Sequence, residues 1–388
     1  MRMQPIPAAA PRRVCRRWTQ AVAALGLGLA ACAALAAPGD EPAPRWMQSL
    51  HDDWAVPRYE RLQAQTQDLA AAVARTCGEP AARGPALEAA RRAWHDSLFT
   101  WRQLEALQLG PTLTRRTSKT IDFWPTRPAV IDKAVQMTAE LPVTGAQAEQ
   151  AMMQWGSAAK GLPALEWLLF PEGRSAPPLT RDAGTCRYAQ RISLALASEA
   201  AQLHADWREQ AARWHALQPP PEQRALSDTL NLFIGSIELL RGKKLAKGAE
   251  MQARVRAGGV PAGSTKGLDA FDSLRSGTTR EMLWAHADAL AQLLLGRTPG
   301  LAFTRDAPAL GLDDLLVQRG HAAQASVLGP AVQRMRQALR ALPADPRQWT
   351  PARVRGAAES LAALRRAIDP AVAQALGVTI TFTDADGD

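Results

Sequence analysis

The spacing of alanine and leucine among arginine and glutamine restricts this chain most strongly, because it fits helices almost throughout. Apolar residues recur at helical intervals over most of the 388 residues, and strong helix formers fill the positions between them. Strand signals are nearly absent, since there are only 2 tyrosines and alternating β-branched residues appear only at the very end. The sequence therefore predicts an all-α protein made of two helical bundles packed together.

Three consecutive prolines, Pro219 to Pro221, make the clearest break in this pattern. Proline cannot continue a helix, so we predict a domain boundary here. The predicted first helical-bundle domain covers residues 45–217 and the second covers residues 222–388, and each is long enough for four helices. We expect the helices themselves near residues 45–77, 86–109, 129–140, 145–158, 163–170, 183–217, 222–243, 269–295, 310–342 and 351–375.

Residues 1–37 have the features of an export signal. Arginines precede a short apolar core, Ala21 to Ala31, which is too short to span a bilayer as an anchor. Two cleavage sites compete: Leu29 to Cys32 resembles a lipobox that would leave Cys32 lipidated, whereas Ala34 to Ala36 fits an ordinary signal peptidase. We favour the lipobox, because Cys32 directly follows the apolar core.

The residue after the lipobox cysteine bears on the destination. Alanine, not aspartate, follows Cys32, so retention at the inner membrane is not indicated. We therefore expect a periplasmic protein whose membrane partner is the outer membrane, reached through a lipid anchor, with residues 38–44 as a short tether.

Two cysteines remain downstream of the leader, Cys77 and Cys186. In an oxidising compartment an even pair readily forms a disulfide, and the alternative is two buried free thiols. A bridge between them would close a loop of roughly 110 residues and stabilise the fold by about 2–5 kcal/mol.

The chain is basic, with a net charge of +9 and a pI near 9.9. The excess lies in arginines that are scattered along helices, and several belong to the leader, so the pattern lacks the clustered tracts of nucleic-acid-binding proteins. We exclude nucleic acid as a partner, while weak attraction to anionic lipid or lipopolysaccharide stays open.

One acidic residue, Glu166, stands in the apolar run from Leu162 to Phe170. A carboxylate on an apolar helix should be buried and needs a partner. Pro163 suits the first turn of a helix, which would place Glu166 near the positive end of the helix dipole. Either Glu166 is a structural residue, which pairs with an arginine or lysine such as Lys243 or Lys244 or caps backbone amides, or it contacts a ligand.

The stretch from Gly161 to Phe170 resembles the signature of the imelysin family, bacterial cell-envelope proteins also classed as M75 peptidases. The family pattern is Gly-x-His-x-x-Glu followed by an aromatic residue and large apolar residues. Gly161 and Glu166 match it, whereas Pro163 stands in the place of the histidine. The Trp-rich segment from Ala90 to Pro111 and the D-F-W-P segment beginning at Asp122 are also similar to the family. The resemblance implies a pair of related bundles and gives Gly161 and Glu166 as binding residues.

A candidate pocket around Glu166 consists of Arg115, Asp122, Glu238 and Arg275. The resemblance implies that the Asp122 stretch lies near the motif helix, and Arg275 offers a counter-ion to either glutamate. The alternatives are structural: a salt-bridge network around Asp122, and a local ion pair between Glu238 and Arg241 three residues later.

The sequence offers little support for a metal site with a complete set of ligands. No histidine precedes a glutamate by three or four residues, and there is no H-E-x-x-H motif. Because Pro163 has no ligating side chain, Glu166 is only a weak candidate metal ligand. We identify no catalytic residue, since neither an activated nucleophile nor a zinc set is visible.

Three functions follow from these observations. The resemblance implies a non-catalytic envelope binding protein linked to acquisition of iron or another divalent metal, with other iron-uptake envelope proteins as partners. The missing histidine favours a structural or adaptor lipoprotein with a degenerate site. A peptidase of the M75 type is the third interpretation and rests on the family name alone.

Overall fold

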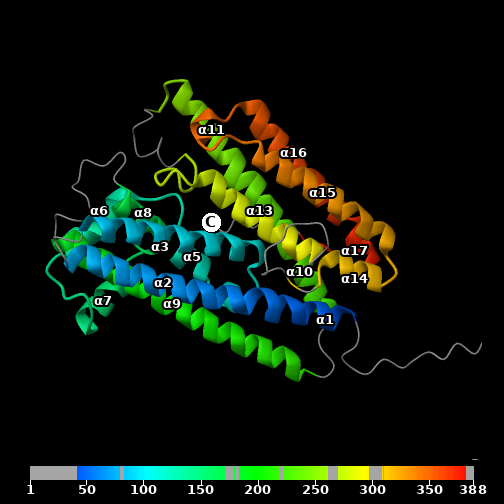
Figure 1. Ribbon diagram of the computed structural model, residues 1–388, viewed down its shortest axis with the longest axis horizontal. Coiled ribbons are helices and arrows are strands. Elements are labelled where there is room, and N and C mark those ends of the chain that lie inside the picture. The colour runs from blue at the N-terminus through cyan, green and yellow to red at the C-terminus, as the bar shows by residue number, and fades with distance from the viewer. Residues whose placement is uncertain are drawn as a thin grey trace, which may run out of the picture. The chain divides into compact units, whose positions relative to one another are not determined.

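The computed structural model describes residues 42–78, 83–170, 183–217, 222–260, 270–296 and 310–381, together with Leu179 and Pro308 (Figure 1). Cys32 and the rest of the leader lie outside the described residues, and so do residues 38–41 of the tether. Every regular element of the described part is a helix, which confirms the all-α class. None of these helices is both long and apolar enough to cross a membrane.

A bundle of long helices forms the first part of the chain. α1 (Pro42–Ser49), the π-helix η1 (Leu50–Ala55) and α2 (Val56–Gly78) follow one another without a break. α2 packs against both α3 (Arg83–Leu104) and α9 (Ala183–Ala216), and Figure 1 shows these three helices side by side. Fully buried tryptophans, including Trp54, Trp101 and Trp207, fill the space between them, as expected for core residues.

Short helices lie between α3 and α9. They hold the motif segment, and α8 packs against both long helices, α3 and α9. In chain order they are η2 (Glu105–Leu107), α4 (Pro111–Thr114), α5 (Thr117–Ile121), α6 (Pro128–Thr138), α7 (Ala146–Gln154), η3 (Ser157–Ala159) and α8 (Gly161–Leu169).

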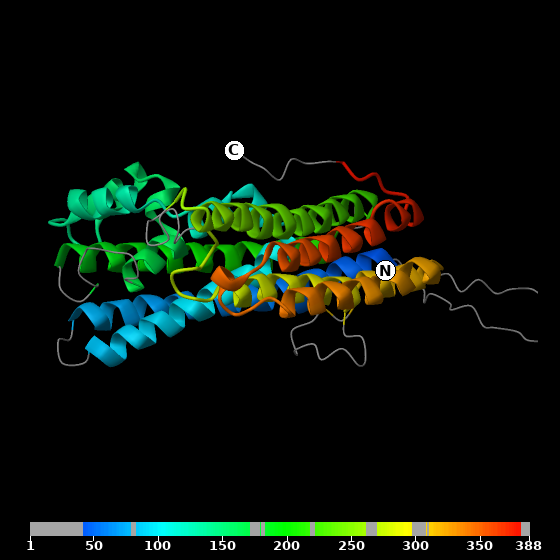
Figure 2. The same cartoon turned by 90° about the horizontal axis from the view of Figure 1, so that it is seen from above.

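The second part of the chain repeats the pattern of a long first helix interrupted by a π-helix. α10 (Glu222–Glu238), η4 (Leu239–Ala246) and α11 (Lys247–Arg256) are continuous. α15 packs against α13, α14 and α16, as the yellow and orange ribbons of Figure 2 show. The remaining elements are α13 (Thr279–Leu295), α14 (Leu312–Gln318), α15 (Ala322–Arg340), η5 (Pro346–Gln348), α16 (Pro351–Ile368) and α17 (Ala371–Ala375).

Several helix boundaries differ from those expected. The first helix begins at Pro42, inside the predicted tether. The helix predicted over 269–295 begins only at Thr279, because Ser273 (φ 58°) and Gly277 (φ 74°) turn the preceding chain through left-handed conformations. The helix predicted over 310–342 is divided at Gly320, whose φ of 82° ends α14.

The two predicted bundles are in direct contact. α3 packs along α13, and Arg58 of α2 donates a hydrogen bond of 2.5 Å to Oε1 of Gln292 on α13. The contacts group Ala37–Asp388 into one compact unit. The boundary between residues 217 and 222 falls between α9 and α10, and a division into two domains there stays a prediction.

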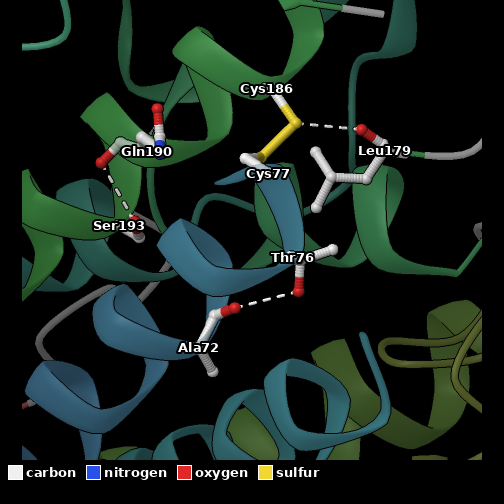
Figure 3. The surroundings of a disulfide bond; sticks show 7 residues. All are labelled: Ala72, Thr76, Cys77, Leu179, Cys186, Gln190 and Ser193. Atoms are coloured by element: carbon white, nitrogen blue, oxygen red, sulfur yellow. Dashed lines mark hydrogen bonds between the residues drawn. A yellow bond between two sulfur atoms is a disulfide. The ribbon is translucent and has the colours of Figure 1, made fainter. Parts of the chain in front are cut away.

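A disulfide joins Cys77 at the end of α2 to Cys186 near the start of α9, as the sequence suggested (Figure 3). The bridge spans 109 positions of the sequence and connects two helices that already pack together. It therefore fixes the end of the first bundle next to Leu179, whose carbonyl oxygen lies 3.1 Å from Cys186 Sγ.

Candidate functional site

Charged side chains from six segments meet in the interior where the two halves of the chain touch. They come from the end of α3, from η2, from the residue after α5, from η4, from the turn before α13 and from α13 itself. All are less than about a tenth exposed, apart from the slightly more open carboxylate of Asp272. The members of this junction cluster are Arg102, Glu105, Asp122, Lys244, Asp272 and His286.

Arg102 holds three of the acids. Its guanidinium donates to Glu105 at 2.8 Å, to Asp272 at 2.5 Å and, from both terminal nitrogens, to Asp122. Glu105 lies one helical turn further along the chain, whereas Asp122 and Asp272 are brought in by other segments. The side chain therefore ties α3 to the segment after α5 and to the turn before α13.

Lys244 is the second cation of the junction cluster. Its Nζ lies 2.6 Å from Asp272, 3.5 Å from Glu105 and 3.9 Å from Asp122, so the same three carboxylates surround it. Lys244 lies on η4, and π-helical turns inside α-helices frequently occur at functional sites. Three carboxylates thus share two buried cations.

The electrostatics of the junction cluster follow from this arrangement. Burial opposes the ionisation of Glu105 and Asp272, but Arg102 and Lys244 hold the pKa of both carboxyls below the usual value, far below for Glu105. Burial raises the pKa of Asp122, and the attraction of Arg102 offsets this only in part. Two of the acids are therefore firmly ionised, and Asp122 is the one that accepts a proton most easily.

His286 connects the junction cluster to Ser236 on α10. The Ser236 hydroxyl lies 2.7 Å from Nε2 of His286, and burial lowers the pKa of the imidazole, which keeps it neutral. Nδ1 lies 3.8 Å from Glu105 Oε2, which is too long for a hydrogen bond. Within the described residues, Nδ1 of His286 and Nε of Arg102 are buried nitrogens without a hydrogen-bond partner.

A small cavity opens beside these two nitrogens. The centre of a water molecule can occupy about 10 Å³ of it, which is room for about one water. The order of Ser236, His286 and Glu105 matches that of a serine-protease triad, but Ser236 does not line the cavity, and a peptide could not enter it. The lining residues are Arg102, Leu240, Lys244, Asp272, Thr279, Met282, Leu283 and His286.

Glu166 lies next to the junction cluster, and its side chain forms a hydrogen bond that joins the first half of the chain to the second. It is 5% exposed, and its Oε1 accepts a hydrogen bond of 2.9 Å from the backbone N–H of Ser276, in the turn before α13. Burial raises the pKa of Glu166 to about 7, while the Ser276 donors and Arg275 oppose that rise. Arg275 stacks over the ring of Trp167 at 4.4 Å. Of the structural alternatives for Glu166, the structure thus shows mainly the hydrogen bond from a backbone amide, with Arg275 as the nearby cation.

The local fold explains the glycine of the motif. α8 begins at Gly161, two residues earlier than predicted, so Glu166 lies in the second turn and the expected help from the helix dipole is absent. Gly161 has a φ of 73°, and a Cβ there would lie 2.2 Å from the carbonyl oxygen of Ile121. Only glycine permits this approach. The structure therefore gives Gly161 a packing role next to Asp122.

The other predicted pocket residues divide into two groups. Asp122 lies in the junction cluster, and Arg275 lies close enough to Glu166 to influence its pKa. Arg115 instead bridges to Glu199 and Asp206 on the surface of α9, and Glu238 pairs with Arg241 and Arg365. Neither of these two is part of the junction cluster, because each has a nearer partner of opposite charge.

Sequence reasoning missed Arg102, Glu105, Asp272 and His286. Arg102 and Glu105 are three residues apart, a spacing that usually marks a solvated pair on a helix surface. The available signal was their position among Trp101, Leu104 and Leu107, an apolar stretch that is buried in the structure. Asp272 and His286 carry no comparable signal, because only the packing of the turn and α13 brings them inward.

Comparisons with known proteins agree with this fold. Residues 55–377 match the family model of Peptidase_M75, described as imelysin. An imelysin-like protein from Psychrobacter arcticum 273-4 has a similar structure, with a TM-score of 0.67 and 17% identity over 88% of this chain and 98% of that one. A protein from Parabacteroides distasonis ATCC 8503, assigned as an iron-regulated protein A precursor, gives a TM-score of 0.68 and 17% identity over 86% and 95%. No curated protein matches the chain.

Proposed function

Because the chain belongs to the imelysin family, we propose that it is an exported cell-envelope binding protein that takes part in iron acquisition without catalysing a reaction. The link to iron is supported by the structural likeness to the protein assigned as an iron-regulated protein A precursor. Export is supported by the leader over residues 1–37, and we propose lipid attachment at Cys32.

The junction cluster is the observation that carries this proposal. Burying charged groups costs several kcal/mol for each ion, and apolar side chains of similar volume often serve stability equally well. A fold held only by packing would therefore gain little from Arg102, Lys244 and their acids at its centre. Together with Glu166 and the small cavity, they give the interior a polar centre that is suited to binding rather than to chemistry on a peptide.

The charge balance of the junction cluster limits how tightly it can bind a metal ion. Among the described residues, no three His, Cys, Asp or Glu side chains are placed so that they could hold a metal ion. The carboxylates already face Arg102 and Lys244, so a metal ion would have to compete with two resident cations. We therefore propose that this chain binds metal weakly, and that a histidine at position 163 would strengthen binding.

The same charge balance favours a second candidate function, that of an adaptor lipoprotein with a degenerate site. Uptake of radioactive iron by a strain that lacks the gene separates the two. If the junction cluster is the binding centre, the wild type restores uptake and Asp272→Asn does not, although it is exported and folded. If the protein is an adaptor, Asp272→Asn restores uptake fully. Failure of the wild type itself would remove the link to iron.

The proposed anchor has its own test. Cys32→Ala should move the protein from the membrane fraction to the soluble periplasmic fraction. Mature protein that begins after Ala36 and carries no lipid would show instead that ordinary signal peptidase cleaves the leader.

A further inference from the structure

The outer hairpin of the second half, formed by α15 and α16, is strongly basic. Residues 322–377 contain eight arginines and three acidic residues, a net charge of +5, whereas residues 45–217 contain 20 basic and 18 acidic residues, a net charge of +2. The two helices pack side by side at one edge of the described part (Figures 1 and 2). The positive charge of the chain is thus concentrated on this hairpin.

Most of these arginines have no acidic partner. Arg336, Arg347 and Arg365 form ion pairs with acids. The other five are exposed, and within the described part of the chain none of them forms a salt bridge. They are Arg334, Arg340, Arg353, Arg355 and Arg366, of which Arg340 places its guanidinium over the ring of Trp284 at 3.9 Å.

The acids of the hairpin do little to neutralise this surface. Asp345 pairs with Arg347, and Asp369 lies 3.8 Å from Arg365. Among the described residues, Glu359 alone of these three acids is exposed and forms no salt bridge, so the unpaired charge of the surface stays clearly positive.

Exposed apolar side chains accompany the arginines. Val317 on α14 is 55% exposed, and Val327 on α15 is 45% exposed. Val327 and Arg334 are seven residues apart and so lie on the same face of α15. Basic side chains next to apolar ones on an exposed helical face are typical of segments that rest on a membrane surface.

We propose that the α15–α16 hairpin docks on the anionic surface of a phospholipid bilayer, with the unpaired guanidinium groups bound to headgroup phosphates. Arginine suits this role because its planar guanidinium binds phosphate with two parallel hydrogen bonds. The unpaired charges lie at the end of α15, at Arg334 and Arg340, and along α16 from Arg353 to Arg366, a distance of about 20 Å, and such an extended surface fits a bilayer better than a compact acidic ligand. This docking is independent of the junction cluster.

Vesicle binding by residues 38–388, which lack the leader and any lipid anchor, tests the proposal. We expect binding to vesicles that contain phosphatidylglycerol, no binding to pure phosphatidylcholine vesicles, and release at about 0.5 M NaCl, where charges are screened within a few ångströms. A triple variant should bind phosphatidylglycerol vesicles at least about tenfold more weakly than the wild type; it combines Arg353→Gln, Arg355→Gln and Arg366→Gln.

The matched control is Arg75→Gln, Arg92→Gln, Arg208→Gln, which removes the same charge from exposed positions of α2, α3 and α9. It should change binding less than about twofold, and circular dichroism should show both variants folded. Equal loss in the two variants would mean that net charge, not the hairpin, drives binding. The proposal would be overturned if the wild-type chain did not bind phosphatidylglycerol vesicles at low salt, even if it bound an acidic protein through the hairpin.

Discussion

Replacing Arg102 by methionine tests whether the junction cluster is held as a balanced set of charges. The guanidinium binds Glu105, Asp122 and Asp272, and the side chain is 2% exposed. Methionine fills much of the space but leaves three carboxylates with Lys244 as the only remaining cation of the cluster. Removing one partner of a buried ion pair costs about 3–5 kcal/mol, because the other charge is stranded.

This free energy converts into a shift of the melting temperature. The entropy of unfolding is about 2.1 cal/mol/K for each residue, so it is roughly 0.7 kcal/mol/K for Ala37–Asp388. We therefore expect Arg102→Met to lower the melting temperature by about 4–7 °C at neutral pH. The loss should shrink towards pH 5, because stranded carboxyls have a raised pKa and protonation relieves them.

Arg115→Met is the matched control, since it removes an arginine that also faces two acids, Glu199 at 3.0 Å and Asp206 at 3.4 Å. Arg115 is 31% exposed, and exposed pairs contribute less than about 1 kcal/mol, so the melting temperature should fall by about 1 °C or less. Calorimetry of both variants at several pH values gives the comparison. Equal shifts, or a shift for Arg102→Met that does not depend on pH, would show that the loss does not come from stranded buried carboxylates.

Three further predictions concern single features of the fold. The raised pKa of Glu166, about 7, means that its contribution favours the folded state at low pH and is lost as the pH rises through 7. The wild type should therefore lose up to about 3 kcal/mol of stability from this residue between about pH 5 and pH 8, and urea unfolding of Glu166→Gln should lack that slope. Gly161→Ala should cost at least about 2 kcal/mol through its positive φ and the contact with Ile121, whereas Gly156→Ala, with open space around it, should be nearly neutral in the same denaturant titration. Removing both Cys77 and Cys186 by mutation to alanine should cost about 2–5 kcal/mol, and an unchanged melting temperature would show that the bridge contributes nothing.

Helical spacing was enough to predict the fold class, because the apolar positions of α2, α9 and α10 recur at helical intervals and need no knowledge of their partners. The interruptions were not predictable in the same way. The turn at Ser273 requires a positive φ, which a serine in the sequence does not indicate. The π-helices η1 and η4 depend on packing and not on local propensity.

The candidate site was predicted only where a charge stood out from its local sequence. Glu166 is a lone acid in an apolar run, and its burial followed from that alone. Arg102 and Glu105 have the spacing of an ordinary surface pair, so their burial depends on α13 and η4 covering them. Arg115 shows the opposite case, because it precedes Asp122 closely in sequence but points to acids on α9.

Titration of metal-free protein with ferrous iron is the direct test of metal binding near Glu166. We expect weak binding by the wild type, further weakened in Glu166→Gln, and binding at least about tenfold tighter in Pro163→His, which restores the family histidine one helical turn before Glu166. Calorimetry gives the affinity, and elemental analysis after gel filtration gives the number of ions for each chain. Tight binding of one ion by the wild type that Glu166→Gln leaves unchanged would contradict the placement of the site, and no binding by any of the three proteins would contradict the binding role itself.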